Sequence, residues 1–212
     1  MYENFPLESI EEFPSLIQAQ PFLVGLNVTI PYKEQVIPFL SSVNDVALEI
    51  GAVNTIQLKD GKLLGSNTDV FGFMQSISKV MDSHHSRALV LGTGGSSKAV
   101  VYGLKKMGLE YTLVSRKPEF ENEISYDDLN RDLMRKCTVI VNTTPLGMFP
   151  NIDHCPPIPY EYLTRSHLLF DLVYNPEETL FLKKGKAAGA TTKNGLEMLQ
   201  LQAERSWQTW NS

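Results

Sequence analysis

Lys33 and Asp69 are the residues of this 212-residue chain that could together perform acid–base chemistry on a carbonyl group. A lysine held by a carboxylate can give a proton to a carbonyl oxygen as hydride arrives, and take it back in the reverse direction. Because an ordinary lysine has a pKa near ~10.4, burial or a cationic neighbour would have to lower it for work as a base at neutral pH. Taken singly, a solvated lysine and a helix N-cap explain the two residues better.

Both residues lie in polar loops of an otherwise apolar region. The loops are Asn27–Lys33 (NVTIPYK), Gly51–Thr55 (GAVNT) and Gly65–Asp69 (GSNTD). The first ends a predicted strand at Phe22–Val28, and the third follows a hairpin with Asp60-Gly61 at its turn. Ligand groups gather at strand ends in α/β folds, so we expect the three loops to meet in one cleft.

A glycine-rich segment, Gly92-Thr93-Gly94-Gly95-Ser96-Ser97-Lys98, has the context of a dinucleotide site. It follows a predicted strand at Arg87–Leu91 and opens a predicted helix at Ser96–Met107, and a strand at Tyr111–Val114 comes next. Glycines permit a tight turn that brings backbone N–H groups and a helix N-terminus against a pyrophosphate. Ser97 stands where the usual fingerprint has Gly or Ala. The order of elements favours a dinucleotide site over a purely structural turn.

The end of the second strand indicates which dinucleotide. An NAD site normally carries Asp or Glu about 20 residues after the glycines, where it holds the ribose hydroxyls. This chain has Ser115-Arg116-Lys117 there instead. Arg116 could bind a 2′-phosphate through two parallel hydrogen bonds, with Lys117 and Ser115 adding charge and a further bond. We favour NADP over the alternative of an exposed basic turn.

The overall composition narrows the partners. Nineteen Lys and Arg against 24 Asp and Glu give a net charge of -5, which argues against nucleic acid as a partner. No apolar run reaches the ~18 residues of a membrane span, and the first residues do not resemble a secretory signal. Cys137 and Cys155 lack paired spacing, and the four histidines lack metal-ligand spacing. We therefore expect a cytoplasmic protein, monomer or homodimer, that acts on a small molecule without a metal.

Alternating strand and helix patterns predict an α/β fold with a largely parallel sheet. The polar stretch Met81–Arg87 suggests a boundary between a first domain, 1–82, and a Rossmann-type domain, 83–194, with 195–212 assigned to the first. Within the second domain we expect strands at Cys137–Val141 and Leu168–Val173, and a helix near Thr179–Ala188. Further helices are predicted from Pro31 through Phe39, from a Ser42/Asp45 cap to Gly51, over Val70–Met81, and at the end of the chain, where Leu196, Leu199, Ala203, Trp207 and Trp210 share one face.

These motifs, in this order, resemble the shikimate dehydrogenase family. The resemblance covers the chain from about Tyr2 to the last helix. Besides the three loops and the glycine segment, three further strings carry the resemblance: Asn142–Met148 (NTTPLGM), Asp171–Pro176 (DLVYNP) and Gly195–Gln202 (GLEMLQLQ).

The resemblance implies a role for each matched position. Lys33 is similar to the family's catalytic lysine and Asp69 to the aspartate paired with it. The implied substrate ligands are Thr29, Lys33, Asn54, Asp69, Tyr174 and Gln202. The implied cofactor-binding residues are Gly92, Thr93, Gly94, Gly95, Ser96, Ser115, Arg116, Lys117, Asn142, Thr143, Val173 and Gly195. The family's last helix folds back onto the first domain, which would bring Gln202 to the cleft.

The implied reaction is the reversible reduction of 3-dehydroshikimate to shikimate by NADPH. Family members normally begin with a strand, a Ser-x-Ser loop that holds the substrate carboxylate, and a helix, and no such string precedes Asn27. Such an anchor is worth several charge-assisted hydrogen bonds of roughly 1.5–3 kcal/mol each. We therefore expect NADP binding to be retained better than turnover. A non-catalytic NADP(H)-binding module and a quinate/shikimate dehydrogenase remain alternatives.

Overall fold

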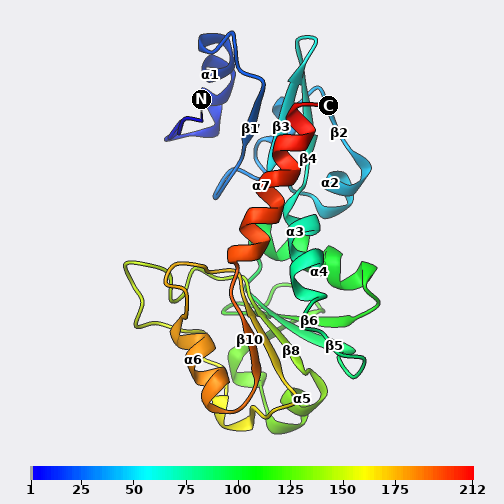
Figure 1. Cartoon of the computed structure of the whole chain (residues 1–212), viewed down its shortest axis with the longest axis vertical. Helices are drawn as coiled ribbons and strands as arrows, with labels where there is room; N and C mark the ends of the chain where they lie inside the picture. Colours follow the sequence, from blue (N-terminus) through cyan, green and yellow to red (C-terminus); the bar gives the residue numbers. More distant parts are fainter. Residues whose placement is uncertain (1) are drawn as a thin grey trace. The chain divides into compact units, whose positions relative to one another are not determined.

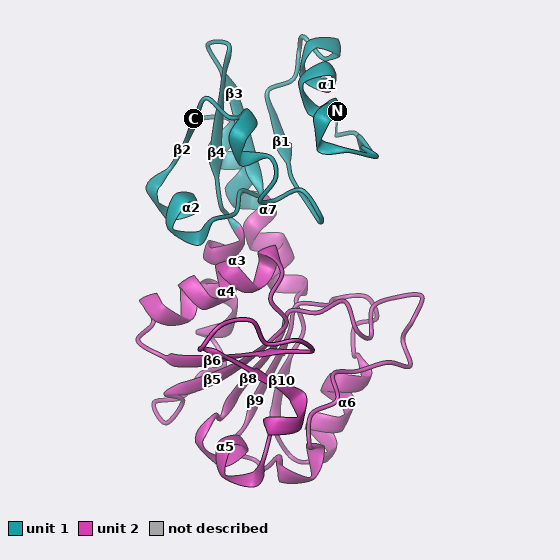
Figure 2. Cartoon of the chain, turned by 180° about the vertical axis from the view of Figure 1, so that it is seen from behind, with its two compact units in different colours: residues 1–68, 204–212 teal, residues 69–203 magenta. Residues whose placement is uncertain are grey.

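A computed structural model describes residues 2–212, which form two compact units (Figures 1 and 2). Unit 1 contains the residues up to Thr68 together with Glu204–Ser212, and unit 2 is Asp69–Ala203. The chain passes between the units after Thr68 and again within its last helix. The functional domain limits expected from the sequence, 1–82 with 195–212 and 83–194, stay a prediction. No helix of the described residues is long and apolar enough to cross a membrane.

Unit 1 is built on a four-stranded sheet of order β1-β3-β4-β2. The β1–β3 and β3–β4 pairs are antiparallel, and β2 runs parallel to β4. Its elements are η1 (Ile10–Glu12), α1 (Phe13–Ala19), β1 (Gly25–Asn27), η2 (Ile37–Phe39), β2 (Ser42–Val43), α2 (Asp45–Ile50), β3 (Thr55–Lys59) and β4 (Lys62–Ser66). The hairpin predicted from Asp60-Gly61 is confirmed. Both turn residues have positive φ, 51° and 71°, as a type I′ turn requires.

Two local predictions in unit 1 are wrong. The segment from Pro31 forms turns, and only Ile37–Phe39 is a 3₁₀ helix. Pro38 lies within it and has no N–H to donate to a carbonyl one turn earlier, so an α-helix cannot continue through it. The predicted Ser42 cap is also misplaced: Asn44 is the N-cap of α2, and its side chain accepts a hydrogen bond from the Ala47 N–H at 2.8 Å.

Unit 2 contains a six-stranded, fully parallel sheet of order β10-β9-β8-β5-β6-β7. The strands are β5 (Arg87–Leu91), β6 (Glu110–Ser115), β7 (Glu123–Ser125), β8 (Val139–Asn142), β9 (Leu168–Asp171) and β10 (Thr191–Lys193). The helices are α3 (Asp69–Ile77), α4 (Gly95–Lys106), η3 (Tyr126–Asp128), α5 (Arg131–Lys136), η4 (Tyr160–Tyr162), α6 (Leu180–Ala187) and α7 (Leu196–Trp210). Helix α7 ends in unit 1. The α/β class and the four central strands are confirmed. The sequence missed β7 and β10, which are three-residue, largely polar edge strands.

Helices cover both faces of this sheet, as alternation along β5 requires. Ala88 and Val90 belong to a core with residues of α3, α4 and the start of α7. Leu89 and Leu91 belong to a second core with residues of α5 and α6. The carboxyl ends of the parallel strands lie together along one edge of this sheet, and their amino ends lie along the opposite edge. The connecting loops at these two edges are free to bind ligands.

Helix α3 packs very closely on α7 at Gly72. A β-carbon built at this glycine would lie 2.5 Å from the Met198 carbonyl oxygen and 3.2 Å from the Gln202 β-carbon. Asp69 begins α3 one turn before Gly72. The absent side chain at residue 72 therefore sets where the first turn of α3 lies against the Gln202 turn of α7.

We expect Gly72→Ala to lower the free energy of unfolding by about 1–3 kcal/mol, because the new methyl group meets backbone rather than a flexible side chain. Urea denaturation of the whole chain measures this. Gln75→Ala, at an exposed position of α3, is the matched control and should change stability by less than about 0.5 kcal/mol. Equal effects of the two substitutions would contradict the close packing at Gly72.

Candidate functional site

The glycine segment after β5 forms a loop whose backbone only glycine adopts easily. Gly92 has φ 103°, and a β-carbon there would lie 2.9 Å from Thr143 Oγ1. The loop is tied to both neighbouring strand ends: the Gly92 N–H donates to the Val114 carbonyl at 2.9 Å, and the Thr143 N–H donates to the Leu91 carbonyl at 3.0 Å. Strands β5 and β8 are adjacent at the centre of the sheet, where successive connections diverge to opposite sides. This is the switch point at which open α/β sheets bind ligands.

The next glycines leave room for a phosphate at the start of α4. Gly94 is the N-cap of this twelve-residue helix, and a β-carbon added to it would meet nothing within 4 Å. Ser97, which departs from the usual fingerprint, is buried and donates from Oγ to the Gly94 carbonyl at 2.6 Å. The hydroxyl thus fits the tightly packed position that Gly or Ala usually takes. The open N-terminus of α4, with Thr93 and Ser96 beside it, suits a pyrophosphate.

The basic turn after β6 lies at the same edge of the sheet. Ser115 ends β6, and its hydroxyl both accepts from the Lys117 N–H at 3.1 Å and donates to the Lys117 carbonyl at 3.0 Å. These bonds close a tight turn that leaves the Arg116 and Lys117 side chains exposed. The structure therefore brings Ser115–Lys117 beside the strand that carries the glycine loop, as a 2′-phosphate contact requires.

A buried hydrogen-bonded cluster joins the ends of β8 and β9. Asn142 and Asp171 are paired across the two strands and have no exposed surface. The Asn142 amide donates to Asp171 Oδ1 at 2.9 Å, and its oxygen accepts from the Thr144 N–H at 3.0 Å. Asp171 also accepts from the Val173 N–H at 3.0 Å and from the Thr179 hydroxyl at 2.5 Å. One carboxylate thus holds both loops and, through Thr179, the first turn of α6.

Burial raises the pKa of Asp171 to about 6, while its hydrogen bonds from Thr179, Val173 and Asn142 act in the opposite direction. Sequence reasoning assigned no role to Asp171, although the string DLVYNP contains it. It likewise missed Thr179 and Thr144. Thr179 is the first residue of the predicted helix, and a threonine at that place was a usable signal for an N-cap.

Val173 and Gly195, two predicted cofactor contacts, are adjacent in space. The Gly195 N–H donates to the Val173 carbonyl at 3.2 Å. A β-carbon at Gly195 would lie 2.1 Å from the Leu172 carbonyl oxygen, so any larger residue would force the two segments apart. Tyr174 follows Val173 and is 46% exposed, which leaves its ring accessible.

In unit 1, hydrogen bonds join the three polar loops. The Val28 N–H donates to the Asn54 carbonyl at 2.8 Å, and the Val53 N–H donates to the Lys33 carbonyl at 2.7 Å. The Asn54 amide donates to Thr68 Oγ1 at 3.0 Å, and its oxygen accepts from the Thr68 N–H at 2.7 Å. The loops that carry Lys33, Asn54 and Thr68 are therefore held together by backbone and side-chain bonds.

Ser206 of α7 completes this network, and no sequence signal pointed to it. Its hydroxyl lies 2.7 Å from Thr55 Oγ1 and 3.0 Å from Thr68 Oγ1, and it accepts from the Asn27 amide at 3.0 Å. Ser206 is fully buried. The last helix therefore returns to the first unit, as expected, and a hydroxyl anchors it there.

The predicted catalytic and substrate residues fall in both units. Thr29, which is exposed, and Lys33, which is half-buried, lie in unit 1 with Asn54, which is 2% exposed. Asp69, which is 7% exposed, and Gln202 lie in unit 2 on the closely packed helices α3 and α7. Their roles stay predictions.

Unit 1 also contains a groove of about 980 Å³ between its first residues, β1 and the end of α7. Its lining is mostly apolar and includes Phe13, Phe22, Trp207 and Trp210. Of the predicted substrate ligands in this unit, only Thr29 lines it. A polyhydroxylated substrate would find few partners there, so the groove is not the place that gathers the predicted ligands.

Comparison with known proteins identifies the family. Residues 1–56 match the family model described as the shikimate dehydrogenase substrate binding domain. A shikimate dehydrogenase (NADP(+)) of Methanococcus aeolicus is 38% identical over 200 residues, which cover 88% of this chain and 72% of that protein. The chain belongs to the shikimate dehydrogenase family. A second shikimate dehydrogenase (NADP(+)), from Caldicellulosiruptor bescii, is 35% identical over 227 residues, covering 99% of this chain and 78% of its own.

Solved structures agree with this assignment. The shikimate 5-dehydrogenase of Thermus thermophilus, determined in complex with NADP(H) and shikimate, superimposes with a TM-score of 0.83 at 31% identity. The match covers 97% of this chain and 79% of that one. The two-domain α/β fold expected from the sequence is thereby confirmed.

Titration of Asp171 should make stability depend on pH. Its folded pKa lies above the ordinary value of 3.8, so the folded chain holds this proton more tightly than the unfolded chain. The protonated Asp171 therefore contributes fully to the free energy of unfolding below about pH 4. This contribution, on the order of 2–3 kcal/mol, is lost as pH rises through about 6. Urea unfolding of the wild type and Asp171→Asn between these pH values tests this. The difference between the two curves should fall with pH, whereas for the exposed Asp153→Asn control it should stay flat. A flat difference for both would contradict the prediction.

Arg116→Ala should weaken NADP⁺ binding about ten- to a hundredfold, because a charge-assisted pair of hydrogen bonds to the 2′-phosphate is lost. NAD⁺ lacks that phosphate, so its affinity should stay within about twofold. Calorimetric titration of both dinucleotides measures the ratio. Arg165→Ala removes an exposed arginine before β9, at the opposite edge of the sheet, and controls for net charge. Equal losses for NADP⁺ and NAD⁺ would show that Arg116 does not select the cofactor.

Proposed function

We propose that this protein catalyses the reversible, NADP-dependent reduction of 3-dehydroshikimate to shikimate, a step of aromatic amino acid biosynthesis. The observation that carries the proposal is family membership: relatives 35–38% identical over most of the chain are named shikimate dehydrogenase (NADP(+)). The geometry of unit 2 supports it independently, because the loops after β5, β6, β8 and β9 all meet at one edge of a parallel sheet.

The residues of unit 2 fit NADP. Gly92–Ser96 and the N-terminus of α4 would hold the pyrophosphate, and Ser115, Arg116 and Lys117 the 2′-phosphate. Asn142, Thr143, Val173 and Gly195 would border the nicotinamide half. The bound cofactor supplies the hydride that is exchanged with the substrate.

The chain's own residues would handle the proton and the orientation of the substrate. Lys33 donates a proton to the carbonyl oxygen during reduction and accepts it during oxidation, and Asp69 holds the lysine ammonium and the neighbouring hydroxyl. Thr29, Asn54 and Gln202 bind ring hydroxyls, and Tyr174 covers the substrate. The buried bonds from Asn54 to Thr68 fix the direction of the Asn54 amide before the substrate arrives.

The choice of substrate and the cellular setting rest on the relatives' names and on the charge of the chain. The relatives reported above are named for shikimate, which supports shikimate over quinate and catalysis over mere cofactor binding. The net charge of -5 supports a small-molecule role without nucleic acid or membrane partners. We also propose a cytoplasmic location and a monomer or homodimer.

Lys33→Ala should lower kcat for shikimate oxidation about 10²–10⁴-fold, because the proton loses its acceptor. NADPH formation, followed by nicotinamide absorbance, gives the rate, and calorimetry with NADP⁺ should show unchanged affinity. The exposed Lys62→Ala in unit 1 is the matched control and should retain full activity.

Activity that survives Lys33→Ala would reject its catalytic role. NADP⁺ binding without turnover of either shikimate or quinate by the wild type would instead favour a non-catalytic module. Faster turnover of quinate than of shikimate would change the substrate and leave the reaction class intact.

A further inference from the structure

A separate pocket lies at the opposite edge of the unit 2 sheet from the glycine loop. Its volume is about 530 Å³, and it is bounded by the residues that precede β8 and β9. The residues lining it are His84, Arg131, Arg135, Thr138, Glu161, Tyr162, Thr164, Ser166 and His167. None of them has a role in the proposed reaction.

The charged groups lining this pocket favour an anion. Arg131 and Arg135 lie one helical turn apart on α5, so both side chains project from the same face. Arg131 stacks over the Tyr162 ring at 5.3 Å, and Arg135 is 3.9 Å from the exposed Asp132 carboxylate. Among the lining residues Glu161 contributes one negative charge against these two fixed positive charges, and Asp132 beside Arg135 adds a second from outside the lining. Two guanidinium groups lining one pocket are suited to bind phosphate.

A buried donor without an acceptor lies next to this pocket. His85 is 8% exposed, and its Nδ1 accepts a hydrogen bond from the Asp82 N–H at 2.9 Å. Nε2 therefore carries the proton of the neutral ring. The Ser166 backbone interacts with the ring, but no acceptor among the described residues lies within hydrogen-bond geometry of Nε2. His84, which lines the pocket, has its ring centroid 4.1 Å from that of His85. Burial lowers the pKa of His85 and His84 lowers it further, while the Ser166 backbone and Asp82 act in the opposite direction.

A second unsatisfied group lies in the pocket wall. Thr138 Oγ1 is buried without a partner, and among residues 2–212 it and His85 Nε2 are the only buried side-chain nitrogen or oxygen atoms in that state. Unsatisfied buried polar atoms cost stability, and each of them indicates a missing partner. An oxyanion accepts hydrogen bonds from both an imidazole N–H and a hydroxyl.

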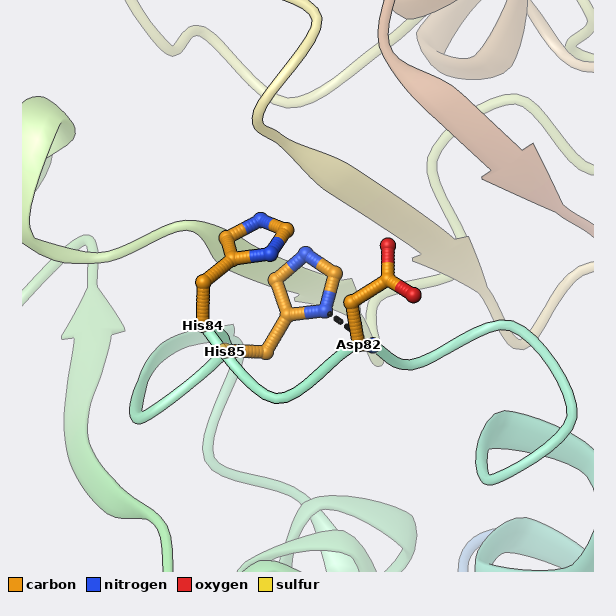
Figure 3. A group of neighbouring side chains, drawn as sticks. All are labelled: Asp82, His84 and His85. Carbon is orange, nitrogen blue, oxygen red and sulfur yellow. Dashed lines mark hydrogen bonds between the residues drawn. The ribbon is translucent and has the colours of Figure 1, made fainter.

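A divalent metal ion is the competing ligand, because donor atoms of Asp82, His84 and His85 lie within 4.8 Å of one another (Figure 3). The hydrogen bond at His85 Nδ1 argues against it. A metal ion needs a lone pair, and Nε2 carries a proton as long as Nδ1 accepts from Asp82. His84 Nε2 also lies 3.1 Å from the Ser166 carbonyl, which it can contact only as a donor.

We propose that this pocket binds the phosphate group of a small molecule, with Arg131, Arg135 and Thr138, which line it, as donors and with His85 beside it, behind the lining residue His84. The volume exceeds that of the phosphate alone and lies within the usual range for small-molecule sites. The site is separate from the cofactor loops and does not depend on the proposed reaction.

The test is a titration of the full chain with inorganic phosphate and with glycerol phosphate, followed by ¹H–¹⁵N NMR of the histidine side chains. Both titrations are run with saturating NADP⁺, because free phosphate would also bind at the glycine loop. We expect the His85 Nε2–H signal to shift, and glycerol phosphate to bind more tightly if the ligand is an organic phosphate. A tighter response to inorganic phosphate would identify the free ion as the ligand.

Three variants sharpen the result. Arg131→Ala with Arg135→Ala should weaken phosphate binding about tenfold or more. Thr138→Val should also weaken it while leaving the unliganded fold as stable or more stable, since an unsatisfied hydroxyl is removed. Lys136→Ala, an exposed cation on the same helix that does not line the pocket, is the control and should change affinity by less than about twofold.

An unchanged His85 signal at saturating phosphate would overturn the proposal. Equal weakening by Lys136→Ala and by the arginine pair would do so as well, because it would show only general charge attraction. A response of His84 and His85 to Zn²⁺ together with no response to phosphate would assign the cluster to a metal ion.

Discussion

The buried carboxylate of Asp171 is the group on which the cofactor side of unit 2 depends. A charge without exposed surface survives only if its oxygens are hydrogen-bonded, and here the donors come from three separate segments. Those segments are the ends of β8 and β9 and the first turn of α6. Their positions are fixed jointly, because moving any of them would leave the carboxylate without a partner. The raised pKa of Asp171 shows that these bonds offset the burial cost only in part.

Unit 1 solves a similar problem with neutral groups. Asn54, Thr55, Thr68 and Ser206 are all nearly or fully buried, and each bonds to at least one of the others. Neutral hydroxyls and amides cost less to bury than a carboxylate, so the network can lie deep in the unit. The network also anchors the last turns of α7, because Ser206 belongs to that helix. A separate hydrogen bond, from the Trp210 indole N–H to the Ile56 carbonyl at 3.0 Å, holds the end of the same helix. A helix that starts in unit 2 thus ends as part of the unit that carries Lys33.

Features determined by neighbouring residues could be predicted from the sequence. Asp60-Gly61 specified its hairpin, and Gly92 with its flanking strand and helix specified the dinucleotide loop, since each depends on backbone conformation over a few positions. The helix expected from Pro31 failed for an equally local reason, the missing N–H of Pro38, which should have been weighed. Edge strands β7 and β10 were missed because three largely polar residues are too few to show a detectable alternation.

The bonds that hold the candidate sites together could not be predicted in this way. Asn142 and Asp171 are 29 residues apart, and Thr55 and Ser206 are 151 apart, so only the folded sheets bring them together. The resemblance to a family supplied Asn54 and Gln202 as ligands, but it offered no reason for Ser206 or Asp171.

The two edges of the unit 2 sheet show why a parallel sheet can hold separate sites. All six strands point the same way, so the loops after the strands collect at one edge and those before the strands at the other. The first edge carries the glycine loop, the Arg116 turn and the Asn142–Asp171 cluster. The second carries His84, Thr138 and the arginines of α5. Residues at one edge can therefore change without disturbing the other, provided that the apolar strand centres between them keep their packing.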